Sequence, residues 1–442
     1  MTPPLDRRDL LLSAGTGLAL AGTSFARPRG AKLRYAAIGC GGMGRSVLSQ
    51  IASHPDVEVV ALCDVDSGMF AKALEIAPGA KTYADYRVML KELAGEIDAV
   101  SVSTPDHMHA AISMAAMTAG LHVYCQKPLT RTVAEARAMT KRAKESGVVT
   151  QMGIQNHSRL QLRTAKELFD RDLIGEIHTV HVWSDRPAGW WAQGVERAGG
   201  EDAVPANLDW DLWLGVAPER PYLNGAYHPF QWRGREDFGT GAQGDMACHL
   251  MDPAVWFLEL GLPRRIRSEG PTPNGETYPL WSQVRYEFDA NERTTRGPLV
   301  LTWHDGKRKP PTDLLEELGT SREEMPANAC LFIGTEGALV ANPYGAQKLY
   351  PADRYADVEI PRLQHVNHWH QWVDACLGEG ECSASFDYSA RLTEIALLGN
   401  VALRFPHETL EYDAEAMRFP ARPAADPHLS PEIRDGWSID GI

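Results

Sequence analysis

Short apolar runs alternate with longer stretches of mixed polarity over residues 32–153. The apolar runs read LRYAAIG, VEVVALC, IDAVSVS, LHVYC and VVTQMG. Runs of this kind are typical of buried strands, and strands that alternate with helices build a parallel, doubly wound sheet. One helix has both ends marked, because Thr132 and Glu135 fit a capping box and Gly147 follows the last turn. The pattern predicts an α/β protein whose N-terminal domain covers this part of the chain.

A glycine-rich loop, GCGGMG, joins the first predicted strand to the first predicted helix. Gly39 allows a tight turn, Gly41 lets a pyrophosphate approach the backbone, and Gly44 lets helix and strand pack closely. Asp64 ends the second strand, where a carboxylate bonds ribose hydroxyls and repels a 2′-phosphate. The alternative is a tight turn that binds no nucleotide. We predict an NAD(H) site made by Asp64 and by the loop residues Gly39, Cys40, Gly41, Gly42, Met43 and Gly44.

Lys127 follows the strand in YCQKPLT, at the carboxyl end where open α/β sheets bind their ligands. A lysine that simply reaches into solvent is the alternative. The position opposite the glycine loop favours a functional lysine.

The stretch GDMACHLMD places Asp245, His249 and Asp252 at helical spacing, which predicts that they share one helix face. Three interpretations are open: metal ligands, a proton-handling pair, or a hydrogen-bonded core histidine. A metal site needs three or four converging ligands, and no second cluster is spaced to supply them. Removing the proton of a secondary alcohol suits a histidine, and Asp245 would fix the tautomer of the His249 ring. We predict no metal and a structural role for Asp252.

Aromatic and polar residues gather between the two halves of the chain, in VWSDRPAGWWAQG, YHPFQWRGREDFGTGAQGD and LTWHDGKRK. Aromatic rings offer flat faces to sugar C–H groups, and polar side chains bond hydroxyls. Tryptophan is also common in protein cores, so some of these residues are structural. The wider set of candidate substrate residues is Trp183, Trp190, Trp191, Trp303, Asp237 and His304. The segment nearest to Asp245 gives the predicted substrate residues Tyr227, His228, Trp232 and Arg233.

The N-terminal segment over residues 1–30 has the layout of a signal peptide. Arg7 and Arg8 precede an apolar stretch from Leu10 to Ala21, and a small-residue region follows it. Paired arginines favour the twin-arginine export route. The apolar stretch is shorter than the roughly 20 residues that a membrane span needs. We therefore expect a periplasmic or otherwise exported protein with no integral span in the mature chain, and both cleavage of the segment and its retention as a tether are open.

The composition narrows the class of protein and its partners. With 442 residues, 44% of them hydrophobic and 23% charged, the chain has the profile of a globular protein with room for two domains. The formal net charge of −14 argues against a nucleic-acid partner. Seven cysteines without a CxxC pair indicate neither a disulfide scaffold nor a zinc–thiolate site, although Cys376 and Cys382 are near enough in sequence to pair. The charged segment 306–328 reads as a surface loop.

Four motifs follow the order found in the Gfo/Idh/MocA family of sugar oxidoreductases: GCGGMG, STPDHMHA, Lys-Pro after a strand, and D-x-x-x-H followed by Asp252. The chain resembles that family from about residue 32 to 405. The resemblance implies a Rossmann N-terminal domain and a C-terminal α+β domain, residues 154–405, with a large open, mostly antiparallel sheet. It also implies a closing helix at about 388–403 that packs near the first domain. Residues 406–442 would then form a C-terminal tail.

The resemblance also implies roles for individual residues. In the family the lysine of Glu-Lys-Pro lies beside the nicotinamide and the substrate, which here is Lys127. This chain has Gln126 in place of the glutamate. The family's aspartate and histidine, here Asp245 and His249, join the lysine in catalysis. The loop along the cofactor corresponds to Thr104, Pro105, Asp106 and His109.

These observations together predict an exported, NAD-dependent carbohydrate oxidoreductase that oxidises a secondary alcohol and retains its cofactor. Two alternatives are open. One is an NAD-dependent enzyme that cleaves glycosides by transient oxidation and elimination, and the other is a sugar- or nucleotide-binding protein without chemistry. We also expect a homo-oligomer that assembles through the C-terminal sheet.

Overall fold

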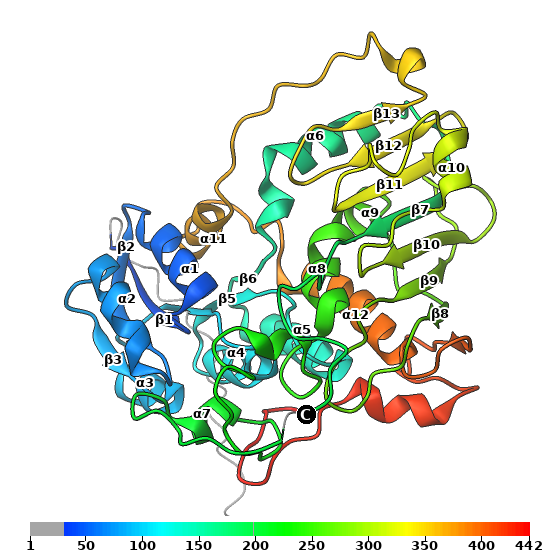
Figure 1. The fold of residues 1–442 in the computed structure, drawn as a ribbon. Coiled ribbons are helices and arrows are strands. Elements are labelled where there is room, and N and C mark those ends of the chain that lie inside the picture. The colour runs from blue at the N-terminus through cyan, green and yellow to red at the C-terminus, as the bar shows by residue number, and fades with distance from the viewer. Residues whose placement is uncertain (1–30, 198) are drawn as a thin grey trace, which may run out of the picture. The chain divides into compact units, whose positions relative to one another are not determined.

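The N-terminal sheet has six parallel strands in the order β3-β2-β1-β4-β5-β6 (Figure 1). The computed structural model describes residues 31–197 and 199–442, so the predicted signal segment lies outside the described residues. All four residues of β4 are buried, as expected for a central strand with helices on both faces. The strands are β1 Leu33–Ile38, β2 Val57–Cys63, β3 Lys81–Tyr83, β4 Ala99–Val102, β5 His122–Gln126 and β6 Thr150–Gly153.

The helices of this sheet begin and end where local sequence signals place them. The Glu135 carboxylate accepts the Thr132 backbone N–H at 2.7 Å, and Gly147 takes a φ of +66° after the last turn, which confirms the capping box and the C-terminal glycine. The α-helices are α1 Gly42–Ala52, α2 Phe70–Ile76, α3 Tyr86–Glu92, α4 His109–Thr118 and α5 Val133–Ser146. Short 3₁₀ turns are η1 Ser67–Met69, η2 Asp106–Met108 and η3 Gln155–Ser158.

The second sheet has eight strands in the order β13-β12-β11-β7-β10-β9-β8-β14. All its pairs are antiparallel except β7 and β10, so the sheet is open and mixed. Together with the parallel N-terminal sheet, this confirms the predicted fold class. The strands are β7 Ile177–Trp183, β8 Arg265–Glu269, β9 Gln283–Phe288, β10 Leu299–His304, β11 Ala329–Gly334, β12 Ala338–Ala341, β13 Lys348–Tyr350 and β14 Thr409–Glu411.

Helices and turns of the second half cover this sheet and connect it to the first. The predicted surface loop at 306–328 contains a helix, α10, because Leu315 is buried beside Trp183 against the sheet. The α-helices are α6 Leu160–Phe169, α7 Trp210–Leu214, α8 Gly241–Leu250, α9 Asp252–Phe257, α10 Thr312–Glu317, α11 His368–Cys376 and α12 Phe386–Ala402. The 3₁₀ turns are η4 Gln231–Gly234, η5 Ala352–Tyr355 and η6 Pro423–Leu429.

Helix α12 ties the two sheets together. It packs against α5 of the N-terminal domain and against α8, and most of its residues are buried (Figure 1). The Arg137 guanidinium on α5 donates to the Glu394 carboxylate on α12 at 2.9 Å, and the Thr393 hydroxyl accepts the Leu129 backbone N–H at 3.3 Å. The helix therefore fixes α8 relative to the strand that ends before Lys127.

The described residues bear on cysteine pairing, membrane spans and metal clusters. Within the described residues, Cys376, Cys382 and the other five cysteines form no disulfide. Within residues 31–197 and 199–442, no helix combines the length and apolar character of a membrane span. Over the same residues, no group of three or more His, Cys, Asp or Glu side chains is arranged to hold a metal ion.

Candidate active site

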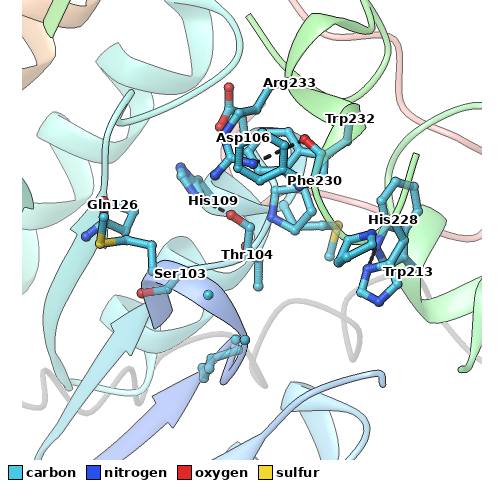
Figure 2. Close-up of a pocket in the computed structure, with 18 of the residues that line it drawn as sticks. Ser103, Thr104, Asp106, His109, Gln126, Trp213, His228, Phe230, Trp232 and Arg233 are labelled. Atoms are coloured by element: carbon cyan, nitrogen blue, oxygen red, sulfur yellow. Dashed lines mark hydrogen bonds between the residues drawn. The ribbon is translucent and has the colours of Figure 1, made fainter. Parts of the chain in front are cut away.

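A single cavity of about 560 Å³ extends along the carboxyl ends of the N-terminal strands and reaches α8 (Figure 2). Its walls come from the glycine loop, the β2, β3, β4 and β5 strand ends, α8 and the irregular segment before α8. Strand ends of a doubly wound sheet are where such folds bind their ligands. The cavity thus joins the predicted cofactor and catalytic residues in one space.

The glycine loop packs so closely against neighbouring backbone that Gly39 and Gly44 leave no room for a side chain. A Cβ on Gly39 would lie 2.5 Å from the Ser103 carbonyl oxygen, and a Cβ on Gly44 would lie 2.0 Å from the Gly39 carbonyl oxygen. Gly42 has a φ of +44° and open space where a Cβ would be. The first turn of α1 directs its free N–H groups toward this space. Gly39, Gly41, Gly42 and Met43 line the cavity, whereas Gly44 lies behind it and sets the helix–strand distance.

Asp64 stands at the end of β2 and organises the loop. Its Oδ2 accepts the Cys40 backbone N–H at 2.7 Å, and its Oδ1 accepts the Asp66 backbone N–H at 2.9 Å. Burial raises the pKa of this carboxyl, while the two backbone N–H groups act in the opposite direction. Cys40 itself does not line the cavity, and only its backbone contributes.

Lys127 and Asp245 form a buried ion pair at the other end of the cavity. The Lys127 Nζ donates to the Asp245 Oδ1 and to the Asp245 carbonyl oxygen, each at 2.7 Å. The Arg233 Nε lies 3.7 Å from the same Oδ1. Burial opposes the charged carboxylate, but Lys127 and Arg233 outweigh it and lower the pKa of Asp245. The pair holds the Lys127 side chain against α8.

His249 lies one turn after Asp245 on α8 and also lines the cavity. Its Nδ1 has no hydrogen-bond partner within the described part of the chain, and burial together with the charge of Lys127 lowers its pKa to about 3. The ring is neutral near pH 7 and free to accept a hydrogen bond. We predicted that Asp245 would fix its tautomer, but the Asp245 carboxylate binds Lys127 instead.

Asp252 does not share the face of Asp245 and His249, contrary to the predicted continuous helix. Helix α8 ends at Leu250, and a new helix, α9, begins at Asp252 with Pro253 in its first turn, where proline is tolerated. The Asp252 carboxylate accepts hydrogen bonds from His157 at 3.0 Å and from Tyr388. It is fully buried away from the cavity, in a structural position.

The loop after β4 brings a further set of residues to the cavity, among them Thr104 and Pro105. His109 connects it to the Lys127 strand end, since its Nδ1 lies 2.9 Å from the Pro128 carbonyl oxygen and its Nε2 lies 2.9 Å from the Thr104 carbonyl oxygen. Gln126 is 6% exposed, and its Nε2 has no partner among the described residues. A buried donor without a partner beside an open cavity is suited to a polar group of a bound molecule.

Asp106, which the family resemblance placed in the loop along the cofactor, lines the cavity. Its Oδ2 accepts the Thr240 hydroxyl at 2.8 Å, and burial raises its pKa to about 7. The residue lies in the STPDHMHA motif, which is the sequence signal that indicates its place beside the cofactor. Ser103, Met108 and Phe230 also line the cavity and lie within quoted motifs, whereas the lining residues Tyr344 and Trp437 lie outside all of them.

Three of the four predicted substrate residues line the cavity, at two different ends of it, and one lies outside it. Trp232 and Arg233 line the cavity near Asp106, and the Arg233 guanidinium stacks on the Trp232 ring at 4.4 Å (Figure 2). Tyr227 does not line it, since its ring is buried against Phe238. The structure places Tyr227 outside the cavity, because its aromatic neighbours take it into a local core.

His228 lines the cavity but faces its nucleotide end. Its Nε2 lies 2.8 Å from the Asp66 carboxylate. Its Nδ1 accepts the Trp213 indole N–H at 3.2 Å (Figure 2). Both ring nitrogens are thus engaged near the end of β2, away from Lys127. The structure gives His228 a position beside the cofactor space rather than the substrate space.

Four of the six wider aromatic and polar candidates lie outside the cavity, and two line it. Asp237 pairs with Arg220, and His304 stacks on His181 within the second sheet. Trp183 and Trp303 are fully buried in the core. Trp190, which is 54% exposed, and Trp191 line the cavity, with the Arg186 guanidinium 3.8 Å above the Trp190 ring.

Comparison with known proteins agrees with this geometry. Residues 33–154 match a family model described as "Oxidoreductase family, NAD-binding Rossmann fold", and residues 159–295 match the C-terminal alpha/beta domain of the same family. The chain is 31% identical to D-glucoside 3-dehydrogenase of Escherichia coli over 270 residues, which are 59% of this chain and 72% of that protein. It is 27% identical to levoglucosan dehydrogenase of Pseudarthrobacter phenanthrenivorans over 40% of this chain and 36% of that one.

Solved structures share the fold. The WlbA dehydrogenase from Bordetella pertussis, in complex with NADH and UDP-GlcNAcA, has a TM-score of 0.61 at 18% identity, covering 86% of this chain and 99% of that one. A levoglucosan dehydrogenase complex with NADH has a TM-score of 0.56 at 18% identity over the same shares. Together with the family match and the nucleotide loop, these similarities show that the chain is an NAD-dependent oxidoreductase acting on CH–OH groups and belongs to the Gfo/Idh/MocA family.

Proposed function

We propose that this protein oxidises a secondary hydroxyl of a sugar or glycoside to the ketone. The observation that carries the proposal is the Lys127–Asp245 pair with the unpartnered His249, which share one cavity with the glycine loop. Support for a carbohydrate comes from relatives named as D-glucoside and levoglucosan dehydrogenases. A protein that only binds sugar would need no such buried charge arrangement.

The reaction removes a proton from oxygen and a hydride from carbon. NAD, when bound along the glycine loop and Asp64, supplies the hydride acceptor. The neutral His249 ring takes the hydroxyl proton, and the Lys127 ammonium stabilises the negative charge that develops on the oxygen. Asp245 holds Lys127 in place through its 2.7 Å bond, so Asp245 acts as a positioning residue.

The substrate end of the cavity has the chemistry of a sugar site. Trp190, Trp191 and Trp232 present apolar ring faces to C–H groups, and Arg233 and Asp106 offer a donor and an acceptor to hydroxyls. This combination suits a pyranose ring better than a flat or strongly charged metabolite.

The proposal is tested by incubating the purified protein with NAD and a panel of methyl glucosides, levoglucosan and myo-inositol. We expect reduction of NAD, followed at its near-ultraviolet absorbance, with at least one pyranoside, and formation of the matching keto sugar. No oxidation of any member, by a protein that still binds NADH, would contradict the proposal.

A second function is favoured by one relative, a glycosyl hydrolase family 109 protein of Stenotrophomonas maltophilia, which is 32% identical over 35% of this chain and 36% of that one. Oxidation at C3 makes the C2 proton acidic, the C1 substituent leaves by elimination, and water addition and hydride return complete a redox-neutral cleavage. Release of p-nitrophenol from p-nitrophenyl glycosides without added NAD and without net NADH identifies this route.

Export, cofactor retention and oligomerisation complete the proposal. The paired Arg7 and Arg8 support twin-arginine export, a route that carries folded proteins and so permits cofactor loading beforehand. Assembly through the C-terminal sheet is proposed from the family resemblance alone. Cell fractionation with an Arg7→Lys/Arg8→Lys variant tests export, dinucleotide released on denaturation tests retention, and light scattering tests the oligomer.

A further inference from the structure

The C-terminal segment over residues 431–442 returns to the N-terminal domain and is bonded beside α7 (Figure 1). The Arg434 backbone N–H donates to the Val216 carbonyl oxygen at 3.0 Å, and its guanidinium donates to the Gly215 carbonyl oxygen at 3.0 Å. The same guanidinium pairs with the Asp211 carboxylate at 2.8 Å. Ile439 is buried in the main core. The segment is therefore anchored on both sides of Trp437.

Trp437 lies between these anchors and lines the nucleotide cavity. The Arg87 guanidinium lies over the indole, 4.4 Å from the ring centroid. Arg87 in turn donates from its Nε and Nη2 to the Asp85 carboxylate, at 3.0 and 2.7 Å. Asp85 also lines the cavity and caps α3. The indole is held in position by groups that belong to the nucleotide domain.

The place of Trp437 along the cavity corresponds to the base end. Asp64 marks the ribose, since it ends β2, and the adenine of a dinucleotide lies beyond the ribose on the side of β3. The lining residues on that side are Ala84, Asp85 and Tyr86, which follow β3, with Leu212 on α7. Trp437 belongs to this group, far along the cavity from Lys127.

We propose that residues 431–442 form a strap over the adenine end of the cofactor, with Trp437 as its contact to the base. The inference rests on the proposed function and deepens it, because it names the part of the chain that retains NAD(H). An indole stacked on adenine adds binding free energy, and the anchors on either side make dissociation depend on local opening of the strap. Cofactor loss is then slower than an open cleft would allow.

The test is the rate at which bound NADH leaves the protein, measured by stopped-flow fluorescence after mixing with excess NAD. Trp437→Ala should release NADH about tenfold faster or more, and Trp437→Phe, which keeps an aromatic ring, should fall between it and the unaltered protein. Arg434→Ala keeps the indole but loses the anchor, and it should also release NADH several-fold faster. Arg418→Ala changes an exposed arginine of the same C-terminal region and should leave the rate unchanged.

A second readout does not depend on any variant. Hydrogen–deuterium exchange of residues 431–442 should slow when NADH binds to the unaltered protein. Release at the unaltered rate by both Trp437→Ala and Arg434→Ala, or exchange that NADH does not change, overturns the strap while the oxidoreductase function stands. Absence of NADH binding to the unaltered protein would overturn both.

Discussion

At the residue scale, the site depends on charges that stabilise one another inside the protein. Lys127 and Asp245 are each less than 15% exposed at the side chain, and removing one partner leaves the other charge buried and unpaired. His249, in contrast, has a lowered pKa because burial and the nearby Lys127 disfavour its charged form. The three side chains therefore function as one electrostatic unit.

Substitution of either end of this unit should slow the chemical step. We expect Lys127→Ala and His249→Ala each to lower kcat by about 10² or more, with little loss of NADH affinity for His249→Ala. The double variant should be scarcely worse than the poorer single one, since the two residues act in the same step. Steady-state kinetics and NADH titration measure both quantities, and near-normal kcat for His249→Ala would place the base elsewhere.

Asp64 should decide between the two dinucleotides. Asp64→Ala removes the carboxylate that meets a 2′-phosphate, so the ratio of NADPH to NADH dissociation constants should fall by about tenfold. The same change removes the acceptor of the Cys40 N–H, so both cofactors should bind more weakly. Fluorescence titrations of the variant and of the unaltered protein with each cofactor give the two effects separately. An unaltered protein that prefers NADPH contradicts the assignment.

At the scale of single elements, the contact between α1 and the end of β1 sets the nucleotide loop. Gly44 faces the Gly39 carbonyl so closely that a Cβ has no space, and the obstacle is backbone rather than a movable side chain. The helix can approach the strand only because position 44 is glycine. The loop geometry and the packing of α1 are thus decided by the same residue.

Gly44→Ala should therefore damage folding and cofactor binding together. We expect a loss of about 3 kcal/mol in the free energy of unfolding, since the helix must move away from the strand. Ser49→Ala on the exposed side of the same helix should change this free energy by less than about 0.5 kcal/mol. Urea unfolding with and without NADH compares them, and an unchanged midpoint for Gly44→Ala would refute the close packing.

At the scale of the whole molecule, buried histidines connect stability to pH. Burial lowers the pKa to about 4 for His181 and to about 3 for the other members of this group. Unfolding releases these rings to their ordinary pKa near 6.5, so the unfolded chain binds more protons below that pH. Asp106 and Asp305 have the opposite effect on the pH dependence of stability, because burial raises their pKa values to about 7 and about 6. The remaining histidines of the group are His107, His249, His304 and His368.

The pKa values of Asp64, Glu135 and His109 are also raised, and those of His370 and His428 are also lowered. Because lowered histidines outnumber the raised groups, the free energy of unfolding should decrease as the pH falls from 7 toward 4. His304→Gln should reduce the difference between pH 7 and pH 5 by about 1–2 kcal/mol, because one ring no longer gains a proton on unfolding. His365→Gln, at an exposed position, should leave the difference unchanged. Urea unfolding at both pH values measures it, and a pH-independent stability would contradict the buried neutral rings.

The sequence alone determined features that depend on neighbours along the chain. The glycine loop, the caps of α5, the lysine at a strand end and the one-turn spacing of Asp245 and His249 are local, so spacing and residue type are sufficient to predict them. Helical spacing does not predict where a helix ends, and the structure differs from the sequence prediction at such an end. Asp252 is only three residues after His249, yet a helix break at Leu250 sends it to His157.

Tertiary structure decided the side-chain pairings and positions in the site that depend on residues distant in the chain. Asp245 binds Lys127, 118 positions away, instead of its helix neighbour, because a buried ammonium is a stronger partner for a carboxylate than a neutral ring. His228 turns to Asp66 across 162 positions, and Tyr227 beside it enters an aromatic core. Trp437 reaches the cavity without any motif. Packing and charge pairing between remote segments select these positions, and neither leaves a periodic or spaced signal in the sequence.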